Sequence, residues 1–357
     1  MVPLADDLAR QTREGELYER YNGDWTRCVA CGHRCPIPNG AQGVCKVRFN
    51  RDGRLMVPWG YVASAQCDPI EKKPFFHVHP GALAFSFGML GCDLHCGYCQ
   101  NWVTSQALRD PQSVLRSEPA TPERLVRTAV QLGAKALVST YNEPLITAEW
   151  AVAVFRLARS AGLLTGFVSN GNATPEALEY LEPWVDLFKV DLKGFDDKRY
   201  RQLGGRLQPV LDTIVTLHRM RLWLEIVTLL VPGFNDSDEE LRRLTGFVAD
   251  VSPAIPWHVS AYHEDYRMSG NGGTMAAMLE RAAAIGRTAG LQYVYAGNIP
   301  GTIGDLENTR CPSCQEMLIE RRGYRVRSYR LTSDGRCPSC ATTIPGRWST
   351  APRPLTT

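Results

Sequence analysis

The sequence predicts an α/β fold in which a parallel sheet is curved into a partial or complete (β/α) barrel. Between residues 82 and 298, short apolar runs alternate with patterns of helical period. Helix start signals, such as Thr174-Pro175-Glu176, separate most of these runs. Repeated βα units require crossover connections, which make neighbouring strands parallel. Because periodicity does not show whether a sheet closes, a doubly wound open sheet is the alternative.

The apolar runs place seven strands in this region. They are predicted at residues 82–87, 136–139, 164–169, 187–192, 222–230, 257–262 and 292–295. In a parallel barrel the chemistry lies on loops at the carboxyl ends of the strands. The first strand ends at a loop with three cysteines, so we expect the functional site there.

One helix illustrates the helical signals. Thr121 is suited to the N-cap and Pro122 to the first helical position. Leu125, Ala129 and Leu132 then fall on one face, which we expect to be buried.

Length and composition favour a soluble, cytoplasmic protein with one large domain and two appendages. We assign residues 1–81 to an N-terminal segment, 82–298 to the barrel and 299–357 to a basic C-terminal module and tail. The net charge of +3 is too small to imply a nucleic-acid or membrane partner. No apolar run approaches the ~20 residues that span a bilayer. The first residues include early acids and no apolar signal segment.

The 12 cysteines fall into groups of four, one, three and four. In a chain of cytosolic character, such grouping favours metal binding over disulfides. The groups are Cys28, Cys31, Cys35 and Cys45; Cys67; Cys92, Cys96 and Cys99; and Cys311, Cys314, Cys337 and Cys340.

The group of three is the most informative. Cys92, Cys96 and Cys99 have the spacing C-x3-C-x2-C, which supplies three thiolates. A 4Fe–4S cluster takes one cysteine per iron, so three leave one iron open to a substrate or cofactor. The alternatives are a zinc knuckle that lacks a ligand and three unrelated buried cysteines.

This triad, with Tyr98 before its last cysteine, resembles the radical SAM superfamily. The resemblance implies a radical SAM partial barrel, and a 4Fe–4S cluster that binds S-adenosylmethionine at its fourth iron. Residues 140–144 occupy the place of the family's Gly-Gly-Glu-Pro motif, although the two glycines are missing. Residues 169–172 and 190–193 are similar to the Thr-Asn-Gly and Asp-x-Lys motifs of the pyruvate formate-lyase activating enzyme. The cofactor-binding residues so implied are Tyr98, Asn142, Glu143, Asn170, Asp191, Lys193 and His258. For His258, a hydrogen-bonded core histidine is an equal alternative.

Longer strings narrow the resemblance to the radical SAM member of the AmmeMemoRadiSam system. They are residues 68–77, 99–102, 141–144, 170–174 and 232–236. That family is similar to glycyl-radical activating enzymes, and its name reflects genomic association with Memo-type and AMMECR-type proteins. The implied partners are those proteins, an electron donor such as flavodoxin or ferredoxin, and a protein substrate. We interpret residues 68–77 as a substrate-facing lid or a surface loop, and Cys67 as a small buried hydrophobe in preference to a catalytic thiol.

Each four-cysteine group predicts a closed metal site. The C-terminal group forms two C-x2-C knuckles, which favour a zinc ribbon over a rubredoxin-like iron site. The arginines between them, Arg321, Arg322, Arg325, Arg327 and Arg330, favour a solvated basic face over a nucleic-acid contact. The N-terminal group fits structural zinc or an auxiliary 4Fe–4S cluster. We favour zinc there, because a short segment with little hydrophobic core needs a bound metal to stabilise its fold.

These observations predict a radical SAM enzyme, an oxidoreductase that reductively cleaves S-adenosylmethionine to a 5′-deoxyadenosyl radical. The radical would abstract hydrogen from a protein or small-molecule substrate. A narrower alternative is an activating enzyme for a glycyl-radical enzyme. An alternative of another class is a zinc-ribbon nucleic-acid-binding protein, but the intact triad and the small net charge argue against it. We expect no membrane or nucleic-acid partner.

Overall fold

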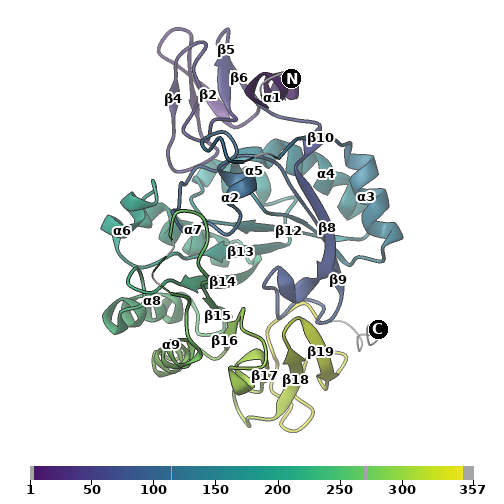
Figure 1. The fold of residues 1–357 in the computed structure, drawn as a ribbon. Helices are drawn as coiled ribbons and strands as arrows, with labels where there is room; N and C mark the ends of the chain where they lie inside the picture. The colour runs from purple at the N-terminus through teal and green to yellow at the C-terminus, as the bar shows by residue number, and fades with distance from the viewer. Residues whose placement is uncertain (1–3, 114, 269, 271, 349–357) are drawn as a thin grey trace. The chain divides into compact units, whose positions relative to one another are not determined.

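The computed structural model describes residues 4–113, 115–268, 270 and 272–348 (Figure 1). The chain divides into two compact units. The first comprises residues 1–67, 85–188 and 200–222, and the second comprises 68–84, 189–199 and 223–357. Among the described residues, no helix is long and apolar enough to cross a membrane. The three segments predicted from the sequence divide the chain differently and stay a prediction.

The first unit combines small antiparallel sheets with βα units. Its elements are α1 (Leu4–Arg10), β1 (Thr12–Glu14), β2 (Tyr18–Tyr21), β3 (Trp25–Cys28), β4 (Pro36–Ile37), β5 (Phe49–Arg51), β6 (Arg54–Pro58), β7 (Tyr61–Val62), α2 (Trp102–Ser105), β10 (Glu118–Pro119), α3 (Pro122–Gln131), β11 (Ala136–Ser139), η2 (Pro144–Thr147), α4 (Ala148–Ser160), β12 (Leu164–Ser169), α5 (Pro175–Leu181) and α7 (Leu207–Arg219). Four elements continue from one unit into the other along the chain: β8 (Ser64–Pro69), β9 (Leu83–Gly88), β13 (Leu187–Asp191) and α6 (Asp197–Gln202).

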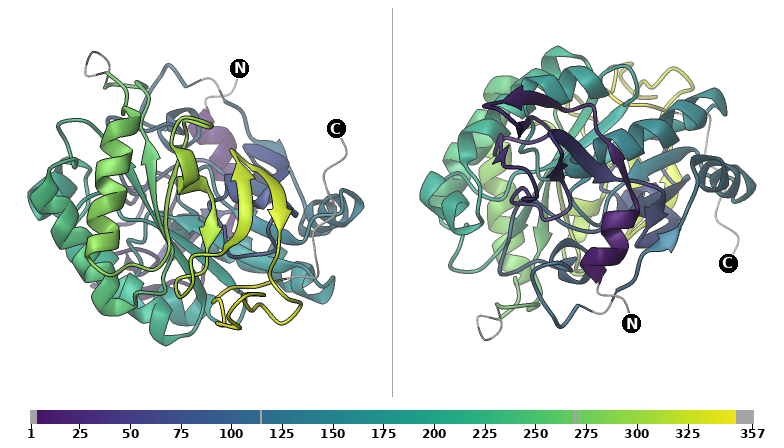
Figure 2. Two further views of the ribbon diagram at one scale, coloured as in Figure 1. Left: turned by 90° about the horizontal axis from the view of Figure 1, so that it is seen from below. Right: turned by 90° about the horizontal axis from the view of Figure 1, so that it is seen from above.

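The second unit holds the later βα units and a small C-terminal sheet (Figure 2). Its elements are η1 (Ile70–Lys72), β14 (Trp223–Leu230), α8 (Asp238–Val251), β15 (Trp257–Ala261), α9 (Ala276–Thr288), β16 (Val294–Gly297), η3 (Gly304–Glu307), β17 (Thr309–Arg310), β18 (Met317–Arg322) and β19 (Arg325–Tyr329). The last three strands form an antiparallel sheet.

The predicted parallel strands are confirmed. In the first unit β11 pairs in parallel with β12, from Ala136 opposite Leu164 onward. In the second unit β15 lies between β14 and β16 and is parallel to both. All seven predicted strands are present, with boundaries shifted by no more than two residues. Closure of the sheet into a barrel stays a prediction.

Helix α3 shows where the sequence patterns held and where one failed. The Thr121 side chain accepts a hydrogen bond from the Arg124 backbone N–H, as an N-cap does. Leu125 and Ala129 are buried, as predicted. The prediction for Leu132 was wrong, since it is 48% exposed. It is the C-cap of α3, beyond the last full turn, so the periodicity no longer applies to it.

The segment 68–77 is neither a lid nor a surface loop, so both sequence interpretations were wrong. Glu71, Phe75 and His77 are buried. Glu225 of β14 accepts hydrogen bonds from the backbone N–H groups of Phe76 and His77, each at 3.0 Å. The segment is therefore part of the packed interior of the second unit.

Arg321 also departs from the predicted basic face. Its side chain is fully buried, 3.6 Å from Glu71, and donates a 2.7 Å hydrogen bond to the Phe76 carbonyl. The guanidinium lies 4.4 Å from the centre of the Phe76 ring. Arg321 of β18 thus fixes the C-terminal sheet to segment 68–77.

Candidate functional site

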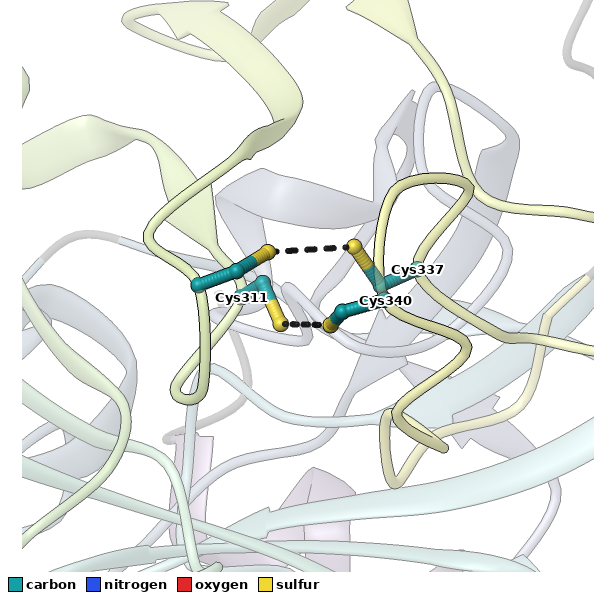
Figure 3. A group of neighbouring side chains, drawn as sticks. Cys311, Cys337 and Cys340 are labelled. Atoms are coloured by element: carbon teal, nitrogen blue, oxygen red, sulfur yellow. Dashed lines mark hydrogen bonds between the residues drawn. The ribbon is translucent and has the colours of Figure 1, made fainter.

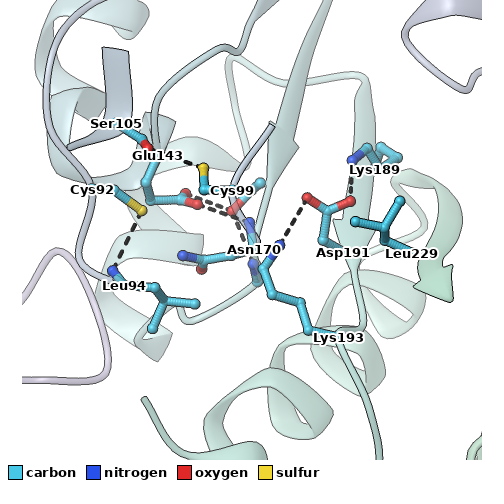
Figure 4. A network of polar contacts seen from close by, with 12 residues as sticks. Cys92, Leu94, Cys99, Ser105, Glu143, Asn170, Lys189, Asp191, Lys193 and Leu229 are labelled. Carbon is cyan, nitrogen blue, oxygen red and sulfur yellow. Dashed lines mark hydrogen bonds and ion pairs between the residues drawn. The ribbon is translucent and has the colours of Figure 1, made fainter. Parts of the chain in front are cut away.

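The three cysteines of the triad lie on the loop between β9 and α2. Figure 4 shows two of them, Cys92 and Cys99. Cys96 is buried, and Cys92 and Cys99 are partly buried. The Leu94 backbone N–H donates to the Cys92 sulfur at 3.4 Å, and the Cys99 sulfur lies 3.1 Å from the Ser105 hydroxyl. Hydrogen bonds to cysteine sulfur are a means by which proteins tune iron–sulfur clusters.

The triad supplies three cysteines, one fewer than a closed four-cysteine metal site needs. Four thiolates on one zinc ion lie about 3.8 Å apart, because each is about 2.3 Å from the metal. Among the described residues, the cysteine group whose sulfurs all lie within 4.8 Å of one another is the C-terminal one.

Asp93 connects the triad to the end of β12, and sequence reasoning missed it. Its Oδ1 accepts a 2.7 Å hydrogen bond from the Asn170 amide, and its Oδ2 accepts one of 2.8 Å from the Asn172 amide. All three side chains are buried. The only signal in the sequence was an aspartate next to Cys92, which alone predicts nothing.

Glu143 joins the ends of β11 and β12. Its carboxylate accepts from the Ser169 hydroxyl at 2.6 Å, from the Asn170 backbone N–H at 2.8 Å and from the Leu145 backbone N–H at 3.0 Å. Burial and, to a lesser extent, the nearby Asp93 carboxylate together raise the pKa of Glu143 to about 8. All three donors belong to the protein, so this carboxylate orders the strand ends.

Two further predicted cofactor residues lie in the first unit. The side-chain oxygen of Asn142 accepts a 2.9 Å hydrogen bond from the Met89 backbone N–H. This bond holds the loop after β11 against the end of β9. Tyr98 is only 3% exposed. The structure thus gathers Asn142, Glu143 and Asn170 around the ends of β9, β11 and β12.

In the second unit, Asp191 lies between two lysines at the end of β13 (Figure 4). Lys193 Nζ is 3.4 Å from one carboxylate oxygen of Asp191, and Lys189 contacts the other. Burial alone would raise the pKa of Asp191, but Lys189 and Lys193 together hold it below its usual value. Asp191 fixes Lys193, as the Asp-x-Lys resemblance implies. Lys189 was missed, because it lies within the apolar strand pattern.

His258, also in the second unit, is hydrogen-bonded inside the protein. Its Nε2 is 2.7 Å from a carboxylate oxygen of Glu225, and its side chain is only 5% exposed. The Phe76 ring meets the imidazole edge-on at 4.7 Å. These contacts favour the alternative of a hydrogen-bonded core histidine.

The C-terminal cysteines form a compact group (Figure 3). The Cys311 and Cys340 sulfurs are 3.5 Å apart, and those of Cys314 and Cys337 are 3.6 Å apart. All four lie within 4.8 Å of one another, close to the separation that one zinc ion requires. Cys311 and Cys337 are buried, while Cys314 and Cys340 are exposed.

The remaining cysteines are in the first half of the chain. Cys67 is partly buried on β8. Cys28, Cys31 and Cys45 are buried and Cys35 is partly buried. Among the described residues, this N-terminal group is not one whose sulfurs gather within 4.8 Å, and zinc there stays a prediction.

The sequence comparisons agree with this geometry. A model of the radical SAM superfamily matches residues 88–245. An uncharacterized protein of Methanocaldococcus jannaschii is 35% identical over 335 residues, which cover 93% of this chain and 98% of that protein. The pyruvate formate-lyase 1-activating enzyme of Escherichia coli K12 is 25% identical over 238 residues, 58% of this chain and 89% of that enzyme. The chain contains a radical SAM domain, belongs to the family of the Methanocaldococcus protein, and is an enzyme. This membership implies a 4Fe–4S cluster and S-adenosylmethionine as cofactors.

Solved structures show more distant likeness. A radical SAM methyltransferase from Sphaerobacter thermophilus has a TM-score of 0.49 and 15% identity, over 62% of this chain and 68% of that one. Streptococcus suis SuiB bound to S-adenosylmethionine has a TM-score of 0.43 and 17% identity, over 64% of this chain and 50% of that one. The assignment to the superfamily therefore rests on the sequence matches.

Proposed function

We propose that this enzyme reductively cleaves S-adenosylmethionine at a 4Fe–4S cluster held by Cys92, Cys96 and Cys99. The observation that carries the proposal is a loop with three cysteines, no fourth cysteine in the group, and a buried polar shell around Asp93. When bound, such a cluster would supply the one electron that cleaves the sulfonium to methionine and a 5′-deoxyadenosyl radical, which would abstract hydrogen from the substrate.

The residues of the chain would hold the reactants and exclude water. Asp93 and Glu143 fix the strand ends, and Asn142 and Asn170 present amide groups beside the triad, with Tyr98 packed in the same loop. From the second unit, Lys193, held by Asp191, offers a cation for the carboxylate of S-adenosylmethionine. The resemblance also implies His258, but its 2.7 Å contact with Glu225 favours a core role, so we leave it out of the proposed set.

The substrate is the next part of the proposal. Similarity to enzymes named for activation of pyruvate formate-lyase supports a protein substrate and a one-electron donor such as flavodoxin or ferredoxin. The same similarity supports activation of a glycyl-radical enzyme as a second candidate. The strings at 68–77 and 232–236 support membership of the AmmeMemoRadiSam system, with Memo-type and AMMECR-type proteins as partners.

We also propose zinc at Cys311, Cys314, Cys337 and Cys340. The close approach of the four sulfurs supports it, as does their position on loops of the antiparallel sheet β17–β19. A closed four-thiolate site has no position for a substrate, so its role would be structural. The zinc site would stabilise a small sheet that buries little apolar surface of its own.

The test is formation of 5′-deoxyadenosine by the reconstituted enzyme with dithionite. The Cys96→Ala variant should form none, because a cluster with two protein ligands is not retained. The matched control is Cys67→Ala, the same change at a cysteine outside the three groups, which should retain wild-type turnover. Wild-type turnover by Cys96→Ala would overturn the proposal.

A further inference from the structure

The four N-terminal cysteines gather in the interior of the first unit. The Cys28 backbone N–H donates a 3.0 Å hydrogen bond to the Cys35 carbonyl. A Cβ added at Gly43, two residues before Cys45, would lie 3.6 Å from the Cys35 sulfur. The segments that carry Cys28, Cys35 and Cys45 therefore pack together.

The group is too open for one zinc ion but not dispersed. All four residues lie in the described part of the chain, yet no three of their sulfurs come within 4.8 Å of one another. In the C-terminal group, by contrast, all four do. A 4Fe–4S cluster takes four cysteines at separate irons and so requires the wider arrangement.

The N-terminal group also packs directly against the triad loop. A Cβ added at Gly91, next to Cys92, would lie 3.1 Å from the Cys45 carbonyl oxygen. Gly91 has φ of +94°, a conformation that other residues rarely adopt. His33 Nε2 lies 3.1 Å from the Asp93 carbonyl oxygen. The two cysteine loops are therefore in contact on both sides of Cys92.

Arg109 joins the two loops through one guanidinium. It donates a 3.0 Å hydrogen bond to the carbonyl of Leu94, inside the triad, and another to the carbonyl of Val44, next to Cys45. Hydrogen bonds of 3.0 and 2.5 Å that meet on one guanidinium place these carbonyls within roughly 8 Å of each other. A charged side chain thus fixes the distance between the two loops.

We infer that Cys28, Cys31, Cys35 and Cys45 ligate a second 4Fe–4S cluster, packed against the first and able to pass it electrons. A one-electron donor of the flavodoxin or ferredoxin class would be oxidised as the second cluster is reduced. The same electron would then move to the first cluster, with no atom or proton transferred. The relay rests on the proposed function, whereas the second cluster does not.

The first test counts iron. Wild-type protein reconstituted anaerobically with iron and sulfide should hold about eight irons, two cubanes of four. Cys92→Ala/Cys96→Ala/Cys99→Ala should keep about four irons and an equal amount of sulfide. On reduction this variant should show the spin-resonance signal of a 4Fe–4S cluster. About four irons in the wild type, or none in the triple variant, would overturn the second cluster. Because the wild-type count needs no variant, a misfolded variant does not spoil the test.

The second test separates the relay from the chemistry. Cys28→Ala/Cys31→Ala/Cys35→Ala/Cys45→Ala, checked to retain the triad iron, should cleave S-adenosylmethionine with dithionite. With reduced flavodoxin its rate should fall at least tenfold relative to the wild type. Equal flavodoxin-driven rates of S-adenosylmethionine cleavage in the variant and the wild type would overturn the proposed electron transfer between the clusters. Eight irons in a wild type that never cleaves S-adenosylmethionine would instead overturn the proposed function and leave the second cluster standing.

Discussion

The two four-cysteine groups contain the same number of thiols in different surroundings. In the C-terminal group the sulfurs lie within 4.8 Å of one another, and two of the four cysteines are exposed. In the N-terminal group no three sulfurs are that close, and three of the four cysteines are buried. The C-terminal group flanks the antiparallel strand pair β18–β19, while the N-terminal group packs against the triad loop. The number of cysteines alone therefore does not identify the metal that a site binds. The spacing of the sulfurs and the neighbouring residues distinguish the two groups.

The difference should be largest in stability. Zinc contributes about 10–16 kcal/mol of apparent binding energy in zinc-finger peptides, and binding energy of this kind is folding energy. Cys311→Ser/Cys337→Ser should lose the zinc and leave residues 309–348 open to proteolysis, while iron is retained. Zinc analysis and limited proteolysis check this, with Cys67→Ser as the matched control. Loss of iron together with zinc would show that the two groups are not independent.

The N-terminal group should depend instead on a buried ion pair. Arg48 meets Glu149 through two hydrogen bonds of 2.9 and 2.6 Å, and both side chains are at most 1% exposed. Glu149→Gln leaves Arg48 buried without its counter-charge, which should cost about 3–5 kcal/mol. Denaturant titration measures the loss, and the iron count should fall as well because Arg48 lies three residues after Cys45.

The control for that change is another ion pair in the first unit. Arg13 and Glu16 are 3.0 Å apart with side chains 42% and 49% exposed. Glu16→Gln should cost less than about 1 kcal/mol, because solvent screens exposed pairs. Equal losses for the two glutamates would show that burial does not set the energy of the Arg48 pair.

Asp93 should matter to the stability of the first unit. Asp93→Asn replaces one acceptor oxygen by a donor that faces the Asn170 or Asn172 amide. Losing one charge-assisted hydrogen bond should cost about 1.5–3 kcal/mol of unfolding free energy. Denaturant titration measures this loss. Asp212→Asn, where an exposed aspartate accepts from the Gln208 amide at 2.9 Å, should leave the unfolding free energy almost unchanged.

A further effect is the response of the second unit to acid. Burial lowers the pKa of His77 to about 4, so the folded state holds it neutral. Unfolding restores a pKa near 6.5, so this contribution to stability is present above pH 6.5 and is lost as the pH falls toward 4. Between pH 7 and 5 the unfolding free energy should drop by about 2 kcal/mol from this group. In His77→Gln the slope of stability against pH should be shallower, whereas an unchanged slope would contradict the assignment.

The sequence predicted the parallel strands and the triad because those signals are local. A strand is visible as an apolar run, and three cysteines within eight positions lie on one loop in almost any fold. Asp93, Arg109 and Arg48 could not be predicted, since their roles come from partners far along the chain. The buried segment 68–77 was misread for the same reason. Its charges look solvated until Glu225 and Arg321 are placed beside it.

The open iron of the triad can be tested most directly by spin resonance of the reduced protein with and without S-adenosylmethionine. Only a cluster with a free iron can bind the cofactor, so part of the wild-type spectrum should change on addition. The spectrum of Cys92→Ala/Cys96→Ala/Cys99→Ala should not change, because a cluster with four cysteines has no open position. A response in that variant, or none in the wild type, would contradict the assignment of the open iron to Cys92, Cys96 and Cys99.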